Sequence, residues 1–220
     1  MPRIRSGIHP AGFATNRFLL TVQGIGMKLP FLIALLGALI FPMNSVAKTE
    51  SLVLGGGCFW CTEAAYELLP GVKKVISGYA GGAEPNPTYE QICTGTTGHA
   101  EVIKIDYDPA QITLEQLLEF FWDAHDPTTP NRQGADVGPQ YRSIILYANE
   151  AQKAAAEKSR TEAQATFRDP IVTEIVPLEK FWPAEAYHQN YFKRNPNQGY
   201  CQYVIAPKVK KLSEKISGGK

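Results

Sequence analysis

Two thiols spaced Cys-x-x-Cys occur in the segment GGGCFWC at positions 55–61, between the apolar run Leu52–Leu54 and the helix-forming stretch 62–69. This layout places the Cys58 sulfur at the first turn of a helix, where free N–H groups and the positive end of the helix dipole favour a thiolate. Phe59 and Trp60 add aromatic faces beside the sulfur. The segment therefore predicts a reactive cysteine in an apolar pocket, with a buried structural cysteine in a glycine-rich turn as the alternative.

Cys93 and Cys201 bring the number of cysteines to four. An even number permits structural disulfides in an exported chain, and four thiolates are able to hold zinc. However, the chain after residue 47 is large and apolar enough to fold without disulfides or a structural metal, and it has a single Cys-x-x-Cys pair. We therefore expect redox work from at least two cysteines, with no metal and no organic cofactor, and we expect Cys93 to be buried and inert.

The composition of the 220-residue chain, 44% of it hydrophobic, suits a globular core. Residues 1–47 contain four basic residues and no acidic one, whereas the remainder is mildly acidic and has no basic run. This distribution argues against nucleic-acid binding. We expect one catalytic domain, residues 48–220, that is a monomer.

The first 47 residues predict a targeting segment. Met27 and Lys28 precede an apolar run over 29–41 that is too short for a comfortable transmembrane span. The run 45–47 then supplies small residues at the −3 and −1 positions of a cleavage site. We expect a signal peptide that starts at Met27 and is cleaved after Ala47, and hence a periplasmic or secreted protein. An uncleaved membrane anchor is the alternative.

Apolar alternation and turn residues predict strands and helices in a mixed order. We expect strands over 52–54, 72–79, 101–107, 144–147 and 171–176, and helices over 58–69, 149–167 and from Pro183 to before Pro196. A capping box of Thr113 and Gln116 opens another helix, and a terminal helix follows Pro207. Segments 85–98, 126–139 and 195–201 are predicted as loops. This order predicts an α+β fold, a two-layer α/β sandwich in which helices flank a mixed sheet with a ferredoxin-like core and long loops.

Six segments resemble, in the family's order, the A-type peptide methionine sulfoxide reductases: GCFWC at 57–61, PNPTYEQIC at 85–93, TGHAEV at 97–102, HDPTTPNRQGADVGPQYRS at 125–143, YHQNYF at 187–192 and NPNQGYC at 195–201. They cover nearly all of the chain after residue 51. The resemblance implies the family's fold and its reaction, the reduction of the S epimer of methionine sulfoxide, free or in proteins, to methionine. A thioredoxin-like disulfide oxidoreductase is the alternative, because strand, Cys-x-x-Cys and helix also open that fold.

The resemblance also implies roles for individual residues. Cys58 would attack the sulfoxide sulfur and become a sulfenic acid, while Glu101 would protonate the oxygen, which requires a pKa raised by desolvation. Tyr89 and Tyr141 match two pocket tyrosines that hydrogen-bond the oxygen, and Asp136 matches an aspartate that orients substrate or water.

Phe59 and Trp60 are expected to form the apolar wall that receives the methyl group on sulfur. The histidines are expected to support the fold: His99, His125 and His188.

A second thiol must convert the sulfenic acid to a disulfide. Cys201 matches the family's C-terminal resolving cysteine, in a loop that we expect to swing toward Cys58. Cys61 stands where many members have glycine, although some members use a cysteine there to resolve, and it lies one helical turn from Cys58. We favour Cys201 and leave Cys61 and a relay through both open. A thioredoxin or thioredoxin-like reductant would recycle the disulfide, and the other partners would be oxidised proteins.

Overall fold

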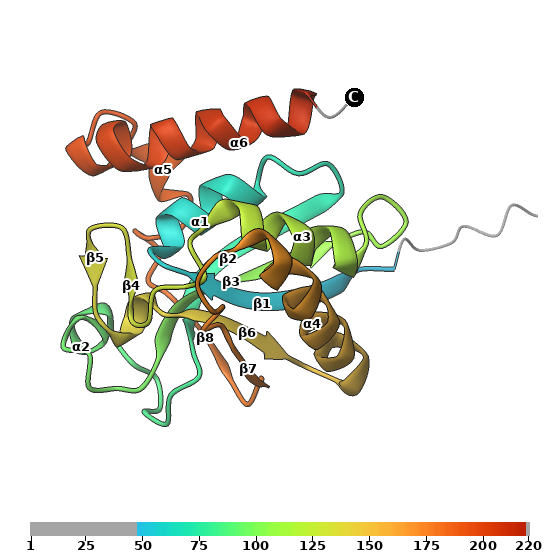
Figure 1. Cartoon of the computed structure of the whole chain (residues 1–220). Coiled ribbons are helices and arrows are strands. Elements are labelled where there is room, and N and C mark those ends of the chain that lie inside the picture. The colour runs from blue at the N-terminus through green and yellow to red at the C-terminus, as the bar shows by residue number, and fades with distance from the viewer. Residues whose placement is uncertain (1–47, 219–220) are drawn as a thin grey trace, which may run out of the picture. The chain divides into compact units, whose positions relative to one another are not determined.

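The computed structural model describes residues 48–218, which are built around a six-stranded mixed sheet (Figure 1). Only the outermost pair, β6 and β7, runs parallel, and the other neighbours are antiparallel. Across the sheet the strands are β7 (Glu174–Pro177), β6 (Ser143–Tyr147), β1 (Glu50–Gly56), β3 (Ala100–Tyr107), β2 (Val72–Ala80) and β8 (Phe181–Pro183). The signal-peptide prediction concerns residues 1–47, which lie outside the described part of the chain.

Six α-helices accompany the sheet in the described residues: α1 (Phe59–Tyr66), α2 (Tyr89–Cys93), α3 (Leu114–Ala124), α4 (Glu150–Ala163), α5 (Tyr191–Arg194) and α6 (Ala206–Gly218). Among residues 48–218, no helix combines the length and the apolar character needed to cross a membrane.

The central strands and two helices form the predicted ferredoxin-like core. The chain runs β1-α1-β2-β3-α3-β6, and the four strands lie in the antiparallel order β6-β1-β3-β2. β7 and β8 extend this core at its two edges. The α+β prediction and the mixed sheet are confirmed.

Strand alternation sends side chains to two apolar layers. Leu52 and Leu54 of β1 join the main core beneath the helices, whereas Val53 joins a smaller cluster on the opposite face. α1 and α3 lie beside each other over the main-core face in Figure 1, and α6 lies beyond α1. The capping box predicted at Thr113 and Gln116 is present at the start of α3.

Two predicted loops contain short regular elements. Segment 85–98 includes α2, which is opened by a capping box of Thr88 and Gln91. Segment 126–139 includes a two-stranded hairpin of β4 (Arg132–Gln133) and β5 (Asp136–Val137). Both elements are too short for their periodicity to emerge from the surrounding Gly and Pro residues.

The prediction that Pro183 opens a helix is wrong. Pro183 ends the edge strand β8, and its Cα is paired with Gly78 of β2. Proline has no N–H to donate, so an edge position suits it. Turns follow Pro183, and the only helix between Pro183 and Pro196 is the single turn of α5.

The prediction that Cys201 lies in a loop is also wrong. Cys201 begins a π-helical turn, Cys201–Ile205, that runs directly into α6, and its side chain is fully buried. The preceding Pro-Asn-Gln-Gly sequence has the composition of a loop, but burial of Cys201 and Ile205 in the core draws the next residues into a helix.

Three predicted boundaries of helices and strands differ from the observed ones by a few residues. The helix predicted over 58–69 ends at Tyr66, after which Leu68 and Leu69 form tighter i to i−3 hydrogen bonds before Gly71. The helix predicted over 149–167 closes with a 3₁₀ turn over 164–166, and β7 starts at Glu174 instead of residue 171.

Candidate active site

Cys58 is held at the junction of β1 and α1. Gly57 before it has a φ of +95°, and a Cβ at that position would stand 2.5 Å from the Gln133 side chain. Only glycine adopts this positive φ without strain and also leaves room for the Gln133 side chain. Cys58 is then the N-cap residue of α1, and its carbonyl accepts hydrogen bonds from the N–H groups of Cys61 and Thr62. Its side chain is only 7% exposed.

Glu101 lies beside the same helix start. It occupies the second position of β3 and is 1% exposed, and its carboxyl oxygen accepts a hydrogen bond of 3.0 Å from the backbone N–H of Phe59. Burial raises the pKa of Glu101 to about 8, against the lowering effect of that hydrogen bond. A carboxyl group that remains protonated at neutral pH is therefore fixed at the N-terminus of α1.

A cavity of about 170 Å³ collects the residues that the sequence predicts for substrate binding. Its lining consists of Cys58, Phe59, Trp60, Tyr89, Glu101, Asp136, Tyr141 and Tyr200. Phe59 and Tyr89 stack with ring centres 6.5 Å apart, so one wall is aromatic and continuous. The cavity combines a thiol, an acid, hydroxyl groups and an apolar wall.

Trp60 is fixed by the C-terminal segment, which the sequence analysis did not connect with the site. Its indole Nε1 donates to Nδ1 of His188 at 3.1 Å, and its ring stacks on Tyr191 with centres 3.6 Å apart. The buried carboxyl group of Glu63 accepts the backbone N–H groups of Asn190 and Tyr191, which fixes that stacking partner. Nothing in a helical Glu-Ala-Ala sequence marks Glu63 as buried.

The two predicted pocket tyrosines come from different elements. Tyr89 begins α2, where its backbone N–H donates to Glu185, which also accepts the Tyr79 hydroxyl. Tyr141 ends the 3₁₀ turn 139–141 before β6. Burial raises the pKa of Tyr89 and of Tyr141, so both hydroxyl groups remain hydrogen-bond donors at neutral pH.

Tyr200 is a site residue that the sequence analysis missed. Its hydroxyl donates to Oδ2 of Asp136 at 2.7 Å and lies 3.9 Å from the Cys61 sulfur. Its ring meets Trp60 edge-on, with centres 6.0 Å apart. Its place immediately before Cys201, in one of the family-like segments, was the available signal.

The predicted cysteines occupy three different settings. Cys58 also lines a second cavity of about 180 Å³, which it shares with Cys61, Asp136, Tyr200 and other residues. Cys61 is 3% exposed and lines this second cavity but not the first, whereas Cys201 is fully buried and lines neither of the two.

The thiol pair does not follow the simple helix-dipole expectation. Burial raises the pKa of Cys58, and the hydrogen bond with Cys61 and the nearby Glu101 carboxyl raise it further. The same thiol–thiol hydrogen bond lowers the pKa of Cys61, with a further contribution from the Lys208 ammonium group. Desolvation therefore outweighs the helix N-terminus at Cys58 in this state.

The prediction that Cys93 is buried is wrong. Cys93 is exposed at the end of α2, because only Ile92 of that helix faces the core. His99 and His125 support the fold, as expected: His99 hydrogen-bonds the backbone of Gly82 and Glu84, and His125 bonds the Phe121 carbonyl and Ser143.

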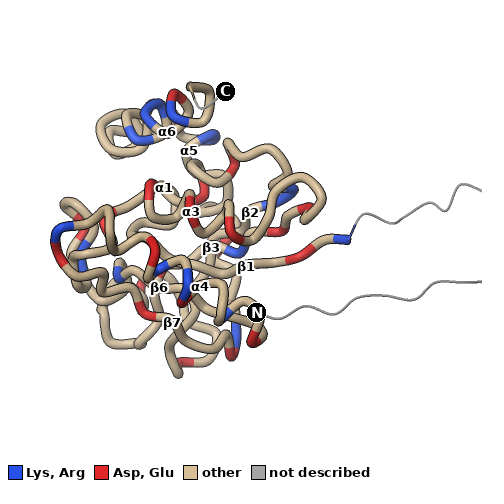
Figure 2. The backbone as a smooth tube through the Cα atoms, turned by 45° about the vertical axis from the view of Figure 1, so that its right-hand side comes forward, with Lys and Arg blue, Asp and Glu red and all other residues tan. Residues whose placement is uncertain are grey.

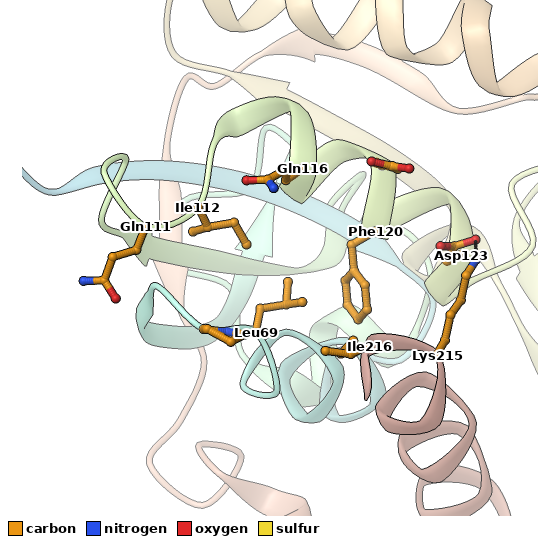
Figure 3. Close-up of a pocket in the computed structure, with 10 residues that line it drawn as sticks. Leu69, Gln111, Ile112, Gln116, Phe120, Asp123, Lys215 and Ile216 are labelled. Carbon is orange, nitrogen blue, oxygen red and sulfur yellow. Dashed lines mark ion pairs between the residues drawn. The ribbon is translucent and has the colours of Figure 1, made fainter. Parts of the chain in front are cut away.

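A larger cavity, of about 480 Å³, lies away from these thiols between α3, the turn after α1 and the end of α6 (Figure 3). Leu69, Phe120 and Ile216 converge in it, and Lys215 pairs with Asp123 at one end. Its lining includes no cysteine, histidine or tyrosine, so it has neither a thiol nor a phenol hydroxyl group.

Comparisons with known proteins agree with this site. The family described as "Peptide methionine sulfoxide reductase" matches residues 50–220. A peptide methionine sulfoxide reductase of Nautilia profundicola is 58% identical over 72% of this chain and 91% of that protein. Its counterpart in Leptospira borgpetersenii is 56% identical over 74% of this chain and 92% of that protein.

Solved structures of the same kind share the fold. The reduced form of Mxr1 from Saccharomyces cerevisiae superposes with a TM-score of 0.68 at 38% identity, over 71% of this chain and 91% of that one. Methionine sulfoxide reductase A of Corynebacterium diphtheriae superposes with a TM-score of 0.63 at 39% identity, over 70% of this chain and 78% of that one.

The raised pKa of Glu101 predicts a pH-dependent stability. Between about pH 4.5 and about pH 8 this carboxyl is protonated in the folded protein and ionised in the unfolded chain, so the folded state binds more protons. Stability should fall as pH rises through this window, by roughly 1 kcal/mol per pH unit from this group. Glu101→Gln should remove that contribution in urea unfolding measured across the window.

Glu63, whose pKa burial raises to about 7, adds a parallel slope that the variant should retain. Glu119→Gln, which removes an exposed carboxyl from α3, is the control for the loss of one charge. Equal slopes in the wild type and in Glu101→Gln would contradict the assignment.

Proposed function

This chain belongs to the A-type peptide methionine sulfoxide reductase family, and we propose that it uses the thiol of Cys58 to reduce the S epimer of methionine sulfoxide, free or in proteins, to methionine. It is thus an oxidoreductase that repairs oxidised methionine. The observation that carries the proposal is the shared cavity of Cys58 and Glu101, where a sulfur nucleophile and a protonated carboxyl lie at one helix start.

A sulfoxide is a poor electrophile, so its oxygen must be protonated as its sulfur is attacked. Glu101 supplies the proton, since burial keeps its carboxyl neutral at pH 7. Tyr89 and Tyr141 donate hydrogen bonds to the same oxygen, because burial also keeps their hydroxyl groups protonated. Burial keeps Cys58 a thiol before reaction, so we propose that the Glu101 carboxylate takes up the thiol proton as its own proton passes to the sulfoxide oxygen. The resulting Cys58 thiolate forms a bond to the sulfoxide sulfur, and the oxygen then transfers to Cys58 as a sulfenic acid while methionine leaves.

The shape of the cavity explains selection of one epimer. Phe59 and Trp60 form the apolar side and receive the methyl group on sulfur, while the hydroxyl groups and Glu101 form the polar side. A chiral sulfoxide presents both its methyl group and its oxygen correctly in only one configuration. Asp136 orients the remaining polar part of the substrate or a water, once the Tyr200 hydroxyl releases it.

We propose that Cys61, in place of the Cys201 favoured from the sequence, resolves the sulfenic acid first. It lies one helical turn from Cys58 and lines a cavity with it, whereas Cys201 is enclosed in a π-helical turn. Condensation of the Cys61 thiol with the sulfenic acid releases water and gives a Cys58–Cys61 disulfide. Exchange of this disulfide with Cys201, the relay left open by the sequence, is not required, because a reductant can attack the Cys58–Cys61 disulfide directly.

A thioredoxin-type dithiol protein returns this disulfide to two thiols and thereby completes the cycle. The thioredoxin-like alternative for the chain itself is not favoured, because the structures that superpose on it are methionine sulfoxide reductases.

Single-turnover methionine formation, without added reductant, tests the reaction. Residues 48–220 should convert the S epimer of methionine sulfoxide and leave the R epimer untouched. Cys58→Ser should abolish the conversion, because no other thiol reaches the first cavity, and Cys93→Ser is the matched control at an exposed cysteine. Conversion by Cys58→Ser, or of the R epimer, would refute the mechanism and return disulfide exchange to consideration.

The resolving step predicts different outcomes for the two remaining cysteines. Cys61→Ser should still form one methionine per protein but should lose nearly all turnover with thioredoxin while retaining turnover with dithiothreitol. Cys201→Ser should retain most thioredoxin-dependent turnover, because the Cys58–Cys61 disulfide still forms. Mass spectrometry of the oxidised proteins reports which disulfide is present, and the reverse pattern of losses would make Cys201 the resolving thiol.

We propose further that residues 1–47 direct export, with a signal peptide that starts at Met27. Support comes from the Met-Lys start, the apolar run over 29–41 and the small residues at 45 and 47. The mature protein would then act in the periplasm or outside the cell. There, its reductant is a thioredoxin-like protein supplied with electrons across the inner membrane.

Expression of the full chain in a Gram-negative bacterium tests export. The periplasmic fraction should contain a protein whose N-terminus is Lys48, and a large residue at position 47, in Ala47→Leu, should leave the precursor uncleaved. A protein that remains in the cytoplasm with residues 27–47 attached would refute export, and a membrane-bound precursor would favour the anchor.

A further inference from the structure

Two separate cavities meet at Cys58. The first contains Glu101, Phe59 and Tyr141, and the second contains Cys61 together with part of the β4–β5 hairpin and the C-terminal helical segment. Asp136 and Tyr200, joined by their hydrogen bond, border both. A molecule in the second cavity therefore reaches the thiols without passing the groups that handle the sulfoxide.

The second cavity has a positive charge at its wall. Lys208 projects from the first turn of α6, is partly buried and lines the cavity with Cys61 and Val204. None of the ion pairs found within residues 48–218 includes Lys208, whereas Lys210 and Lys215 each pair with an acid. Helix α6 has four lysines and one glutamate, and Figure 2 shows these basic positions along its backbone.

We propose that the second cavity is the entry site for the nucleophilic thiolate of the reductant, and that Lys208 attracts this anion and steadies the negative charge as it reaches Cys61. The inference rests on the proposed function, since it concerns the recycling of the disulfide which that reaction produces. It assigns the two cavities to two different halves of the catalytic cycle.

The chemical step balances with a dithiol as the reductant. Its thiolate forms a bond to the Cys61 sulfur, the Cys58–Cys61 bond breaks, and Cys58 leaves with the electron pair as a thiolate at the start of α1. The second thiol of the reductant then attacks the reductant's first sulfur, which is bonded to Cys61 in the mixed disulfide. This step releases Cys61 and leaves the reductant with an internal disulfide. Cys58 and Cys61 are both reduced, and two protons from the dithiol return to them.

The rim of this cavity suits a protein partner. Val204 in its wall is 38% exposed, and the adjoining Tyr203 is 82% exposed. On the hairpin side, Val137 follows the lining residue Asp136 and is 70% exposed. Exposed apolar side chains beside a buried reactive group are typical of a protein docking surface. A thioredoxin-type protein has the required chemistry, because it presents a cysteine thiolate from a protein surface.

Charge and access at this cavity are tested separately. Lys208→Gln removes the charge, Lys208→Arg retains it, and Ala135→Phe fills the second cavity from an exposed position that does not line the first. Lys211→Gln, at an exposed lysine of the same helix, is the matched control. Each protein is assayed for single-turnover methionine formation and for kcat/KM toward purified thioredoxin with its reductase and NADPH.

For Lys208→Gln we expect kcat/KM for thioredoxin, divided by the single-turnover rate, to fall about 5- to 10-fold, the size expected for one charge acting over a few ångströms near a surface. Its dependence on salt should also weaken. Lys208→Arg should restore most of the ratio, Ala135→Phe should lower it, and Lys211→Gln should not change it.

An unchanged ratio in both Lys208→Gln and Ala135→Phe would overturn the inference. A parallel fall of both rates would also overturn it, because the residues would then serve the first half of the cycle or the fold. A failure of the proposed function is distinguishable, since it would appear as a wild-type protein that forms no methionine in the single-turnover assay.

Discussion

The site depends on one hydrogen bond between the backbone N–H of Phe59 and the buried carboxyl group of Glu101. The bond satisfies a free N–H at the start of α1 and fixes an acid beside the cysteine that caps the same helix. It also opposes the rise in the pKa of Glu101, yet burial still raises that pKa to about 8. A carboxyl group that were better hydrated would be ionised at neutral pH and would repel a thiolate. Burial therefore keeps the Glu101 carboxyl protonated, so that it places no negative charge beside the Cys58 sulfur.

This constraint extends into the sheet. Glu101 reaches α1 only because β3 passes close to the end of β1, where a Cβ on Gly55 would lie 2.6 Å from the Glu101 carbonyl oxygen. The ferredoxin-like order places β1 and β3 side by side at the centre of the sheet, so the glycine-rich turn after β1 and the acid on β3 meet there. The aromatic wall depends instead on the C-terminal segment, through the stacking of Tyr191 on Trp60 and the bond from Trp60 to His188. The core thus positions the acid and the thiol, and the chain end positions the wall.

Sequence patterns predicted the elements that have their own periodicity or caps, such as β2, β3, β6 and α3. They failed where tertiary contacts decide the outcome. Pro183 resembles a helix start until β8 is seen paired with Gly78, and Cys201 resembles a loop residue until the core buries it. The residues that line the first cavity were found largely through family resemblance, because a tyrosine or glutamate has no local mark of its destination. Lys208 lies outside the family-like segments, and the packing of the C-terminal helical segment brings it and Tyr200 to the thiols.

The arrangement of the thiols suggests why the chain needs more than one. Cys58 lies beside a neutral acid and lines the cavity in which the first step takes place. Cys61 separates the second step from the first, because it lines the second cavity, beside the Lys208 ammonium group, and does not line the first. Oxidation can then pass from the enclosed sulfur to one that a protein thiolate approaches from the other side. Tyr200 lies at the boundary, bonded to Asp136 and bordering both cavities, so displacement of its hydroxyl by substrate would change the second cavity as the first is filled.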